Sequence, residues 1–200
     1  MNTPRLPDLA VHHLGDDLQF LTGVLAPQLR WPIDLFEEVW NLRPPKKHPI
    51  MIHGSWVETP RWNQAYGADY HFSGQTNKAR PVPTILEPVH SWVREVVGPR
   101  LNGLLLNWYD GPGHYIGPHH DSTKNVVPDT PIVTVSFGET RVFRLSHGPT
   151  GSGIHNFPAP DGTVFVLPFA TNLVWKHSVP KSARYRGRRI SVTFRAFLSP

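Results

Sequence analysis

Apolar residues recur with a helical period in two stretches of the first hundred residues. Within residues 33–42, four apolar side chains fall three or four positions apart or side by side: Ile33, Phe36, Val39 and Trp40. This spacing predicts an amphipathic helix, which the following Pro44-Pro45 pair ends. Residues 84–97 repeat the pattern and stop at Gly98-Pro99. Residues 50–56, between these stretches, predict a hairpin that turns at a glycine.

From residue 104 onward the apolar runs become short and are separated by turn residues. Six of these runs predict strands: Leu104–Tyr109, Ile132–Phe137, Arg141–Leu145, Thr163–Leu167, Asn172–Trp175 and Ile190–Phe197. Many short strands joined by polar loops favour a sandwich or a jelly roll. We therefore expect a mainly β (α+β) fold. One domain spans 1–200, with an N-terminal α/β extension over about 1–100, a jelly-roll core over about 101–200 and a loosely held lead-in to residue 17.

The composition agrees with one turn-rich domain. The chain has 200 residues with 22 prolines and 16 glycines, which suits a single core crossed by many short connections. It has no cysteine, which excludes disulfides, zinc–thiolate sites and cysteine nucleophiles. No apolar run approaches the ~20 residues of a membrane span, and no charged-then-apolar leader opens the chain. We expect a cytoplasmic monomer that has no membrane attachment and no obligate protein partner.

Positive charge is concentrated near the end of the chain. The formal net charge is +5 and the pI is near 9.7. Residues 171–200 contain no acidic residue, and their basic residues are Lys176, Lys181, Arg184, Arg186, Arg188, Arg189 and Arg195. Basic clusters of this kind favour polyanionic partners, of which nucleic acid is the first candidate. The alternative is an ordinary solvated surface run.

Three residues far apart in the sequence fit one metal site. His119 and Asp121 form a His-x-Asp pair after a Gly/Pro-rich loop, and His177 follows a later predicted strand. Two imidazoles and one carboxylate are the ligand set of non-haem Fe(II) with open coordination positions. Taken singly, His119 and Asp121 could be a polar loop pair, and His177 beside Trp175 could be a packed core residue. The combination favours the metal site.

The strand after His177 carries two arginines at its ends. Strand alternation puts Arg189, Ser191, Thr193 and Arg195 on one face and apolar residues on the other. The polar face would be costly to bury unless an anion meets it, and guanidinium groups pair bidentately with carboxylates. Because the two arginines lie ~20 Å apart along the strand, only inward-leaning side chains could hold both ends of one small dicarboxylate. Together with the metal ligands, this pattern suggests an iron-dependent oxygenase that consumes 2-oxoglutarate; the alternative is an edge strand facing solvent.

At these residues the chain resembles the AlkB family of Fe(II)/2-oxoglutarate dioxygenases. The resemblance runs from about residue 52 to 197 and makes six matches in the family's order, of which the first, the lid, consists of three short segments. They are the lid segments Pro60-Arg61, Ala65-Tyr66-Gly67 and Tyr70–Gly74, the strand Asn107-Trp108-Tyr109, the first iron segment Gly113–Asp121, the strand Pro131–Gly138, the segment Trp175–Pro180 and the signature Arg189–Arg195.

The resemblance implies a double-stranded β-helix and a set of site residues. Fe(II) would be held by His119, Asp121 and His177, and the cosubstrates would be 2-oxoglutarate and O2. The residues implied to bind 2-oxoglutarate are Asn107, Tyr109, Arg189, Ser191, Thr193 and Arg195. The residues implied at the substrate, mostly in a nucleotide-recognition lid, are His53, Trp56, Arg61, Tyr66, Ser122 and Thr123.

Three positions depart from the family pattern. Ser191 stands where the signature usually has Asn, which is a longer hydrogen-bonding group. Thr123 stands where base-repairing members tend to carry a carboxylate for an exocyclic amine. His53 stands at the hairpin tip, where duplex-acting members place an intercalating aromatic. These departures bear on the substrate rather than on the chemistry.

The function that the resemblance implies is oxidative demethylation of N-alkylated nucleobases in DNA or RNA. Aromatic and Arg side chains of the lid would stack an extruded base between Tyr66 and His119; the alternative for the lid is hydrophobic packing of the extension. A second hypothesis, favoured by Thr123, is a hydroxylase of a protein or small molecule on the same fold. A third, a catalytically silent nucleic-acid-binding jelly roll, requires a broken ligand set, and the sequence keeps the set intact.

Overall fold

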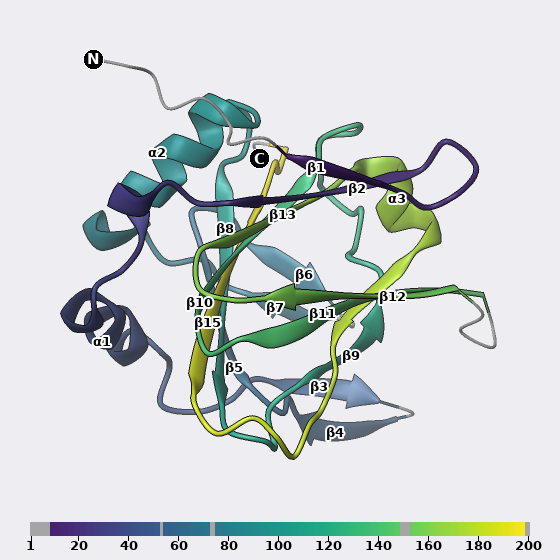
Figure 1. The fold of residues 1–200 in the computed structure, drawn as a ribbon. Coiled ribbons are helices and arrows are strands. Elements are labelled where there is room, and N and C mark those ends of the chain that lie inside the picture. The colour runs from purple at the N-terminus through teal and green to yellow at the C-terminus, as the bar shows by residue number, and fades with distance from the viewer. Residues whose placement is uncertain (1–8, 53, 73–74, 149–152, 199–200) are drawn as a thin grey trace.

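Two antiparallel sheets form the centre of the molecule (Figure 1). The computed structural model describes residues 9–52, 54–72, 75–148 and 153–198. The larger sheet has seven strands in the order β1 (Ala10–His13), β2 (Gln19–Val24), β13 (Thr163–Leu167), β10 (Ile132–Gly138), β15 (Arg188–Arg195), β8 (Gly103–Asp110) and β5 (Trp62–Tyr66). The smaller sheet has the order β12 (Gly153–Ala159), β11 (Arg141–His147), β14 (Lys176–Val179) and β9 (Ile116–His119).

The remaining elements are short helices and two hairpins. The α-helices are α1 (Ile33–Asn41), α2 (Glu87–Val96) and α3 (Phe169–Val174), and the 3-10 helices are η1 (Pro27–Leu29) and η2 (Thr84–Leu86). The hairpins pair β3 (Pro49–Ile52) with β4 (Ser55–Glu58) and β6 (Tyr70–Phe72) with β7 (Gln75–Asn77). Among the described residues, no helix is both long and apolar enough to cross a bilayer.

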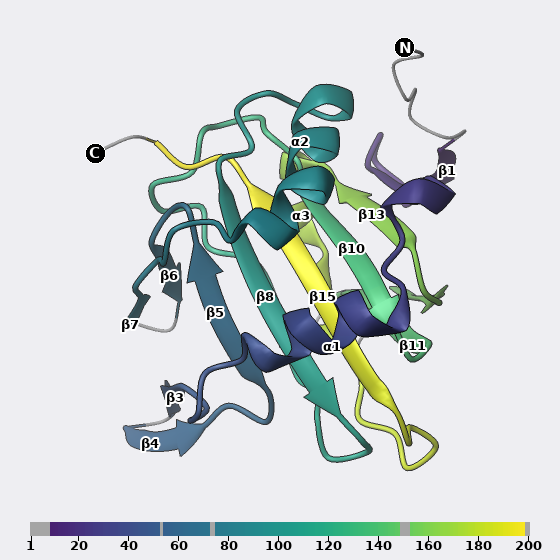
Figure 2. The ribbon, with the colours of Figure 1, turned by 90° about the vertical axis from the view of Figure 1, so that its left-hand side faces the viewer.

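Both predicted helices cover the outer face of the seven-stranded sheet. Figure 2 shows α1 and α2 lying across β8, β15 and β10. Their apolar stripes join the outward residues of these strands in one core cluster, and the Trp108 indole nitrogen donates to the Val39 carbonyl oxygen of α1 at 3.0 Å. A second cluster, which includes Phe20, Phe143 and Phe165, lies between the two sheets. The alternation predicted for β15 is therefore confirmed, because Ile190, Val192 and Phe194 pack under the helices.

Two local predictions were wrong. Residues 172–175, predicted as a strand, mostly belong to helix α3, which begins after Pro168, the residue at its N-cap; a short apolar run alone does not distinguish a strand from a helical turn. The predicted lead-in contains strand β1, which pairs with β2 and extends the seven-stranded sheet. The first hundred residues thus supply both outer strands of the larger sheet, β1 and β5, in addition to the two helices that cover it.

Candidate metal centre and cosubstrate pocket

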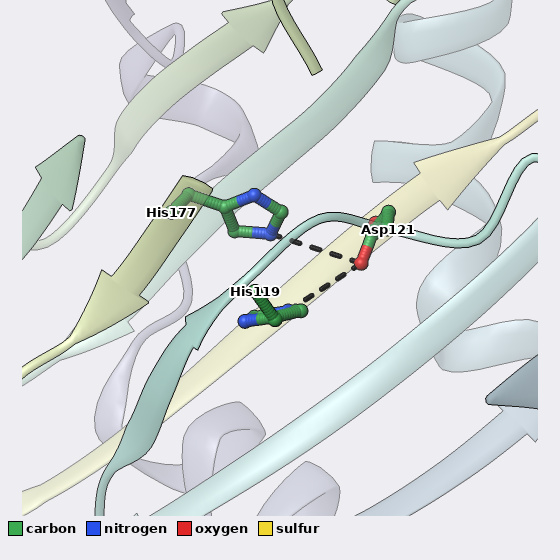
Figure 3. Close-up of side chains that lie close together, drawn as sticks. All are labelled: His119, Asp121 and His177. Carbon is green, nitrogen blue, oxygen red and sulfur yellow. Dashed lines mark ion pairs between the residues drawn. The ribbon is translucent and has the colours of Figure 1, made fainter. Parts of the chain in front are cut away.

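The three predicted metal ligands come together beside the paired strands β9 and β14 of the smaller sheet (Figure 3). His119 is the last residue of β9 and pairs directly with His177 of β14, so the two imidazoles are cross-strand neighbours. Asp121 follows two residues after His119. Its Oδ1 lies 3.5 Å from His119 Nε2 and 3.7 Å from His177 Nε2, and one ligand atom from each residue falls within 4.8 Å of the others.

Hydrogen bonding and burial leave the two histidine ligands in a form that can bind a cation. His119 Nδ1 donates to the Gly117 carbonyl oxygen at 2.8 Å, which fixes the tautomer that leaves the Nε2 lone pair free. Burial, and then the neighbouring His119, lower the pKa of His177 to about 3, so His177 is neutral at physiological pH.

Asp121 is ionised for a different reason. Burial alone raises the pKa of its carboxyl group, but the nearby Arg195 guanidinium, with smaller contributions from the two imidazoles, outweighs burial and holds that pKa far below its usual range. Asp121 Oδ2 has no hydrogen-bond partner among the described residues. Two imidazole nitrogens and one ionised carboxylate around one point are a donor set that Fe(II) accepts, so the residues fit the metal.

Sequence reasoning missed a buried residue that holds this aspartate in place. Asn172 of α3 is 1% exposed. Its Oδ1 accepts from the backbone nitrogen of Asp121 and its Nδ2 donates to the carbonyl oxygen of Asp121, both at 3.0 Å. The backbone carbonyl of Asn172 also accepts from His120 Nδ1 at 2.6 Å. The helix that precedes His177 is thereby tied to the segment that carries the other two ligands.

A cavity of about 470 Å³ extends from the metal ligands along the inner face of the larger sheet. A row of short polar side chains crosses this face at one level, because the strand register pairs Ser136 with Ser191, Ser191 with Asn107 and Asn107 with Asn63. All four are buried. Sequence reasoning missed Ser136 and Asn63, because only the register of four strands aligns them with the other two.

Arg189 closes one end of the cavity. It is 1% exposed and its Nε donates to Ser136 Oγ at 2.8 Å. Its guanidinium lies 5.0 Å from the centre of the Tyr109 ring, whose other neighbours include Arg141 at 5.3 Å. Nη1 of Arg189 has no partner among the described residues. A buried guanidinium with a vacant donor is a site for a carboxylate, which fits one end of 2-oxoglutarate.

Arg195 lies beside the metal ligand Asp121 and is not among the residues that line the cavity. Its Nη1 is 3.9 Å from Asp121 Oδ2, and its Nη2 donates to the Ser122 carbonyl oxygen. Its guanidinium lies 5.1 Å from the centre of the Tyr70 ring. Arg195 therefore stabilises the charge of the aspartate ligand, while Thr193 faces the cavity and its Oγ1 is 3.3 Å from Thr134 Oγ1.

Two of the residues predicted to contact substrate line the same cavity. Arg61, expected in an outer lid, is 8% exposed, and its Nε donates to Asn107 Oδ1 at 2.7 Å. Ser122 also lines the cavity, whereas Thr123 is exposed outside its lining. Trp56 is 61% exposed on β4. His53 lies outside the described residues.

The prediction for Tyr66 was wrong. Its side chain is 2% exposed and belongs to the core cluster under the helices, so it cannot stack a base against His119. The cavity is lined instead by Tyr70 and Phe72 of β6, which the AlkB-like segment at residues 70–74 contains. The reason is alternation along β5, where Asn63 faces the cavity and Tyr66 faces the helices.

A jelly roll with two histidines and an aspartate at its open end defines an iron-dependent oxygenase. The profile of the 2OG-Fe(II) oxygenase superfamily matches residues 28–195, and the chain belongs to this superfamily, within which it is an AlkB homologue. Its cofactor is accordingly Fe(II) and its cosubstrate 2-oxoglutarate.

Named relatives agree with that placement. The chain is 31% identical over 159 residues to the DNA oxidative demethylase ALKBH2 of Homo sapiens, an alignment that covers 74% of this chain and 61% of the human protein. It is 33% identical to the ALKBH2 of Arabidopsis thaliana, covering 98% of this chain and 71% of that protein.

A third relative is the alpha-ketoglutarate-dependent dioxygenase alkB homolog 3 of Rattus norvegicus, at 31% identity over 68% of this chain and 50% of that protein. The matched part of this chain thus spans about three fifths of the human ALKBH2 relative's length. The solved structure of OsALKBH1 superposes with a TM-score of 0.60 at 14% identity, covering 93% of this chain and 99% of that chain; this likeness shows the fold alone.

Proposed function

We propose that this protein oxidatively removes alkyl groups from the ring nitrogens of nucleobases in DNA or RNA. The observation that carries the proposal is a single cavity that contains the metal ligands, the arginine for the cosubstrate and an aromatic wall. That wall comprises Tyr70 and Phe72 of β6 and Tyr115 before β9. Flat aromatic faces beside a metal suit an extruded base, because base–aromatic stacking is worth ~1–3 kcal/mol per base and tolerates every base.

The charge of the surface supports a polyanionic partner. The loop between β14 and β15 exposes Lys181, Arg184 and Arg186. Glu139, which contacts this loop, accepts from the backbone nitrogens of Arg186 and Gly187 rather than from these side chains. Exposed cations can contact phosphates and release counterions. The names of the ALKBH2 relatives add support, because each is described as a DNA oxidative demethylase.

Within this proposal each buried side chain has a distinct task. Fe(II) and 2-oxoglutarate, when bound, supply the O2-dependent oxidation of the C–H bond of an N-methyl group, after which formaldehyde leaves the base. Arg189 binds the distal carboxylate of the cosubstrate. Arg61 holds Asn107 Oδ1, which directs the amide hydrogens of Asn107 into the cavity. Asn172 holds the backbone of Asp121, and Arg195 keeps its carboxylate ionised.

The experiment is succinate release from 2-oxoglutarate measured across methylated oligonucleotides, their unmethylated counterparts and a panel of metabolites and peptides. We expect stimulation by methylated oligonucleotides alone. Stimulation by a metabolite or peptide, with none by any oligonucleotide, would replace the proposal with a hydroxylase of a small molecule or protein. The Asp121→Asn variant, which should release no succinate, is the control for metal-dependent turnover.

A further inference from the structure

The cavity holds an excess of positive charge. Arg61 and Arg189 line it, Arg195 Nη1 lies 3.9 Å from Asp121 Oδ2, and all three arginine residues are at least nine-tenths buried. Asp121 is the single carboxylate among the described lining residues, and its ion pair is with Arg195. Arg61 and Arg189 have no carboxylate within 4.0 Å among the described residues.

Loading the site does not remove this excess. A divalent metal ion and the doubly charged 2-oxoglutarate cancel each other in formal charge, and the two imidazole ligands are neutral when they bind metal. The three guanidinium groups and the carboxylate of Asp121 then leave the loaded site with a formal charge of +2, the sum of +3 and -1. Arg189 is paired with the distal carboxylate of the cosubstrate and Arg195 with Asp121, which leaves Arg61 as the buried cation without an anionic partner.

Arg61 is placed to contact the substrate. It lines the same cavity as Tyr70, which belongs to the aromatic wall, and Asp121, which belongs to the metal centre. One of its five N–H groups is used on Asn107 Oδ1. The remaining donors carry a positive charge in a buried position, where they are stabilised by an acceptor and destabilised by a second cation.

Ser122 supplies no compensating charge on the substrate side. It lines the cavity beside the aspartate ligand, and its hydroxyl oxygen accepts from the backbone nitrogen of Lys124 at 3.2 Å. A carboxylate at this position would add a negative charge to the cavity lining and offset the Arg61 charge, whereas a hydroxyl group adds none. Thr123, the next residue, is also uncharged and stands outside the lining.

We propose that the pocket prefers an uncharged alkylated base with a carbonyl oxygen beside the alkylated nitrogen, over a cationic alkylated base. A methyl group on N3 of thymine or N1 of guanine replaces an N–H, so the base stays neutral and its carbonyl can accept from Arg61. A methyl group on N1 of adenine or N3 of cytosine makes the base a cation, which the buried Arg61 guanidinium repels; 3-methylcytosine keeps a carbonyl oxygen beside N3, so charge is what separates the two pairs of lesions. The inference rests on the proposed function and names its substrate class.

The test compares four oligonucleotides of one sequence that carry 3-methylthymine, 1-methylguanine, 1-methyladenine or 3-methylcytosine. We expect kcat/KM to be at least about tenfold higher for the two neutral lesions, since one charge-assisted hydrogen bond changes an affinity by about that factor. The same order should hold for the Kd values of the protein loaded with Ni(II), which measures recognition without turnover. Equal or tighter binding and faster repair of the cationic lesions would overturn the inference.

Two variants of Ser122, matched in volume, test whether charge in the cavity lining sets the lesion preference. Ser122→Asp adds a carboxylate to the lining, and Ser122→Asn adds nearly the same volume without charge; the first should shift the preference about tenfold toward the cationic lesions relative to the second. Arg61→Gln removes the cation and should abolish the preference in the Ni(II) binding assay even if Ser122→Asp fails to fold. An unchanged lesion preference in Arg61→Gln would contradict the role given to Arg61.

Failure of the inference is distinguishable from failure of the proposed function. Turnover of the cationic lesions with little turnover of the neutral ones rejects the charge argument and keeps the demethylase. No turnover of any of the four lesions, in a protein that binds metal and 2-oxoglutarate, rejects the demethylase itself and the inference with it.

Discussion

Replacing Arg189 should weaken 2-oxoglutarate binding far more than it weakens the fold. Arg189 is 1% exposed, its Nε donates to Ser136 Oγ and its Nη1 has no partner among the described residues. Arg189→Met keeps most of the side-chain volume and removes the charge. The distal carboxylate of the cosubstrate would then be buried without its partner, and breaking a buried ion pair in this way costs ~3–5 kcal/mol.

That free energy sets the size of the effect. Because ~1.4 kcal/mol is a factor of ten, the Kd for 2-oxoglutarate should rise roughly 10²- to 10³-fold in Arg189→Met. Arg189→Lys keeps a charge but loses the planar fork, so its Kd should rise about tenfold. Ser136→Ala removes one hydrogen bond to Arg189 and should raise the Kd only a few-fold.

Calorimetric titration of the Mn(II)-loaded protein with 2-oxoglutarate measures these constants, and the KM from succinate release checks them. Binding of Mn(II) itself should be unchanged, because Arg189 does not contact the metal ligands. A Kd for 2-oxoglutarate within about twofold of the parent value in Arg189→Met would refute the reasoning. It would show that another residue binds the distal carboxylate of 2-oxoglutarate.

Three further predictions follow from the same geometry. His177→Ala should abolish 2-oxoglutarate turnover, because two ligands do not hold Fe(II) in an open site; full activity in this variant would remove His177 from the metal centre. Asn172→Ala breaks two hydrogen bonds to the backbone of Asp121, each worth ~0.5–1.5 kcal/mol, and should weaken Mn(II) binding about tenfold by titration; unchanged metal affinity would show that Asn172 does not position the ligand. Charge reversal at Lys181, Arg184 and Arg186 in the exposed loop should flatten the salt dependence of oligonucleotide binding. It should leave 2-oxoglutarate turnover without oligonucleotide unchanged. An unaltered slope of binding affinity against salt concentration would show that the phosphates bind another part of the surface.

The spacing of apolar residues predicted those helices and strands whose two faces have different surroundings. Helix α1 begins at Ile33, the residue at which it was predicted to begin. The prediction succeeded because the apolar stripe and the prolines after it are both local signals. The alternation in β15 was confirmed because one face packs under helices and the other faces the cavity. The ligand set was found because His119, Asp121 and His177 stand in the order of a known ligand set and are followed by the basic strand, although neither histidine nor aspartate is rare in this chain.

Positions that depend on long-range register could not be predicted in the same way. Tyr66 and Arg61 lie five residues apart, and only the pairing of β5 with β8 decides that one faces the helices and the other lies at the cavity. Residues 172–175 were predicted as a strand. Nothing in the local sequence indicates that the side chain of Asn172 hydrogen-bonds to the backbone of Asp121, fifty-one positions earlier. A short apolar run carries too little information to separate these cases.

The central claim is that oxidation in this cavity falls on an N-alkyl group of a nucleobase. The most direct test incubates the Fe(II)-loaded protein with 2-oxoglutarate, O2 and a single-lesion oligonucleotide carrying an isotopically labelled methyl group, and follows the intact mass of the oligonucleotide. The account predicts loss of the methyl group, labelled formaldehyde and succinate in equal amounts, with none of the three in Asp121→Asn. Succinate formed at the same rate with and without the lesion, while the oligonucleotide keeps its methyl group, would contradict it.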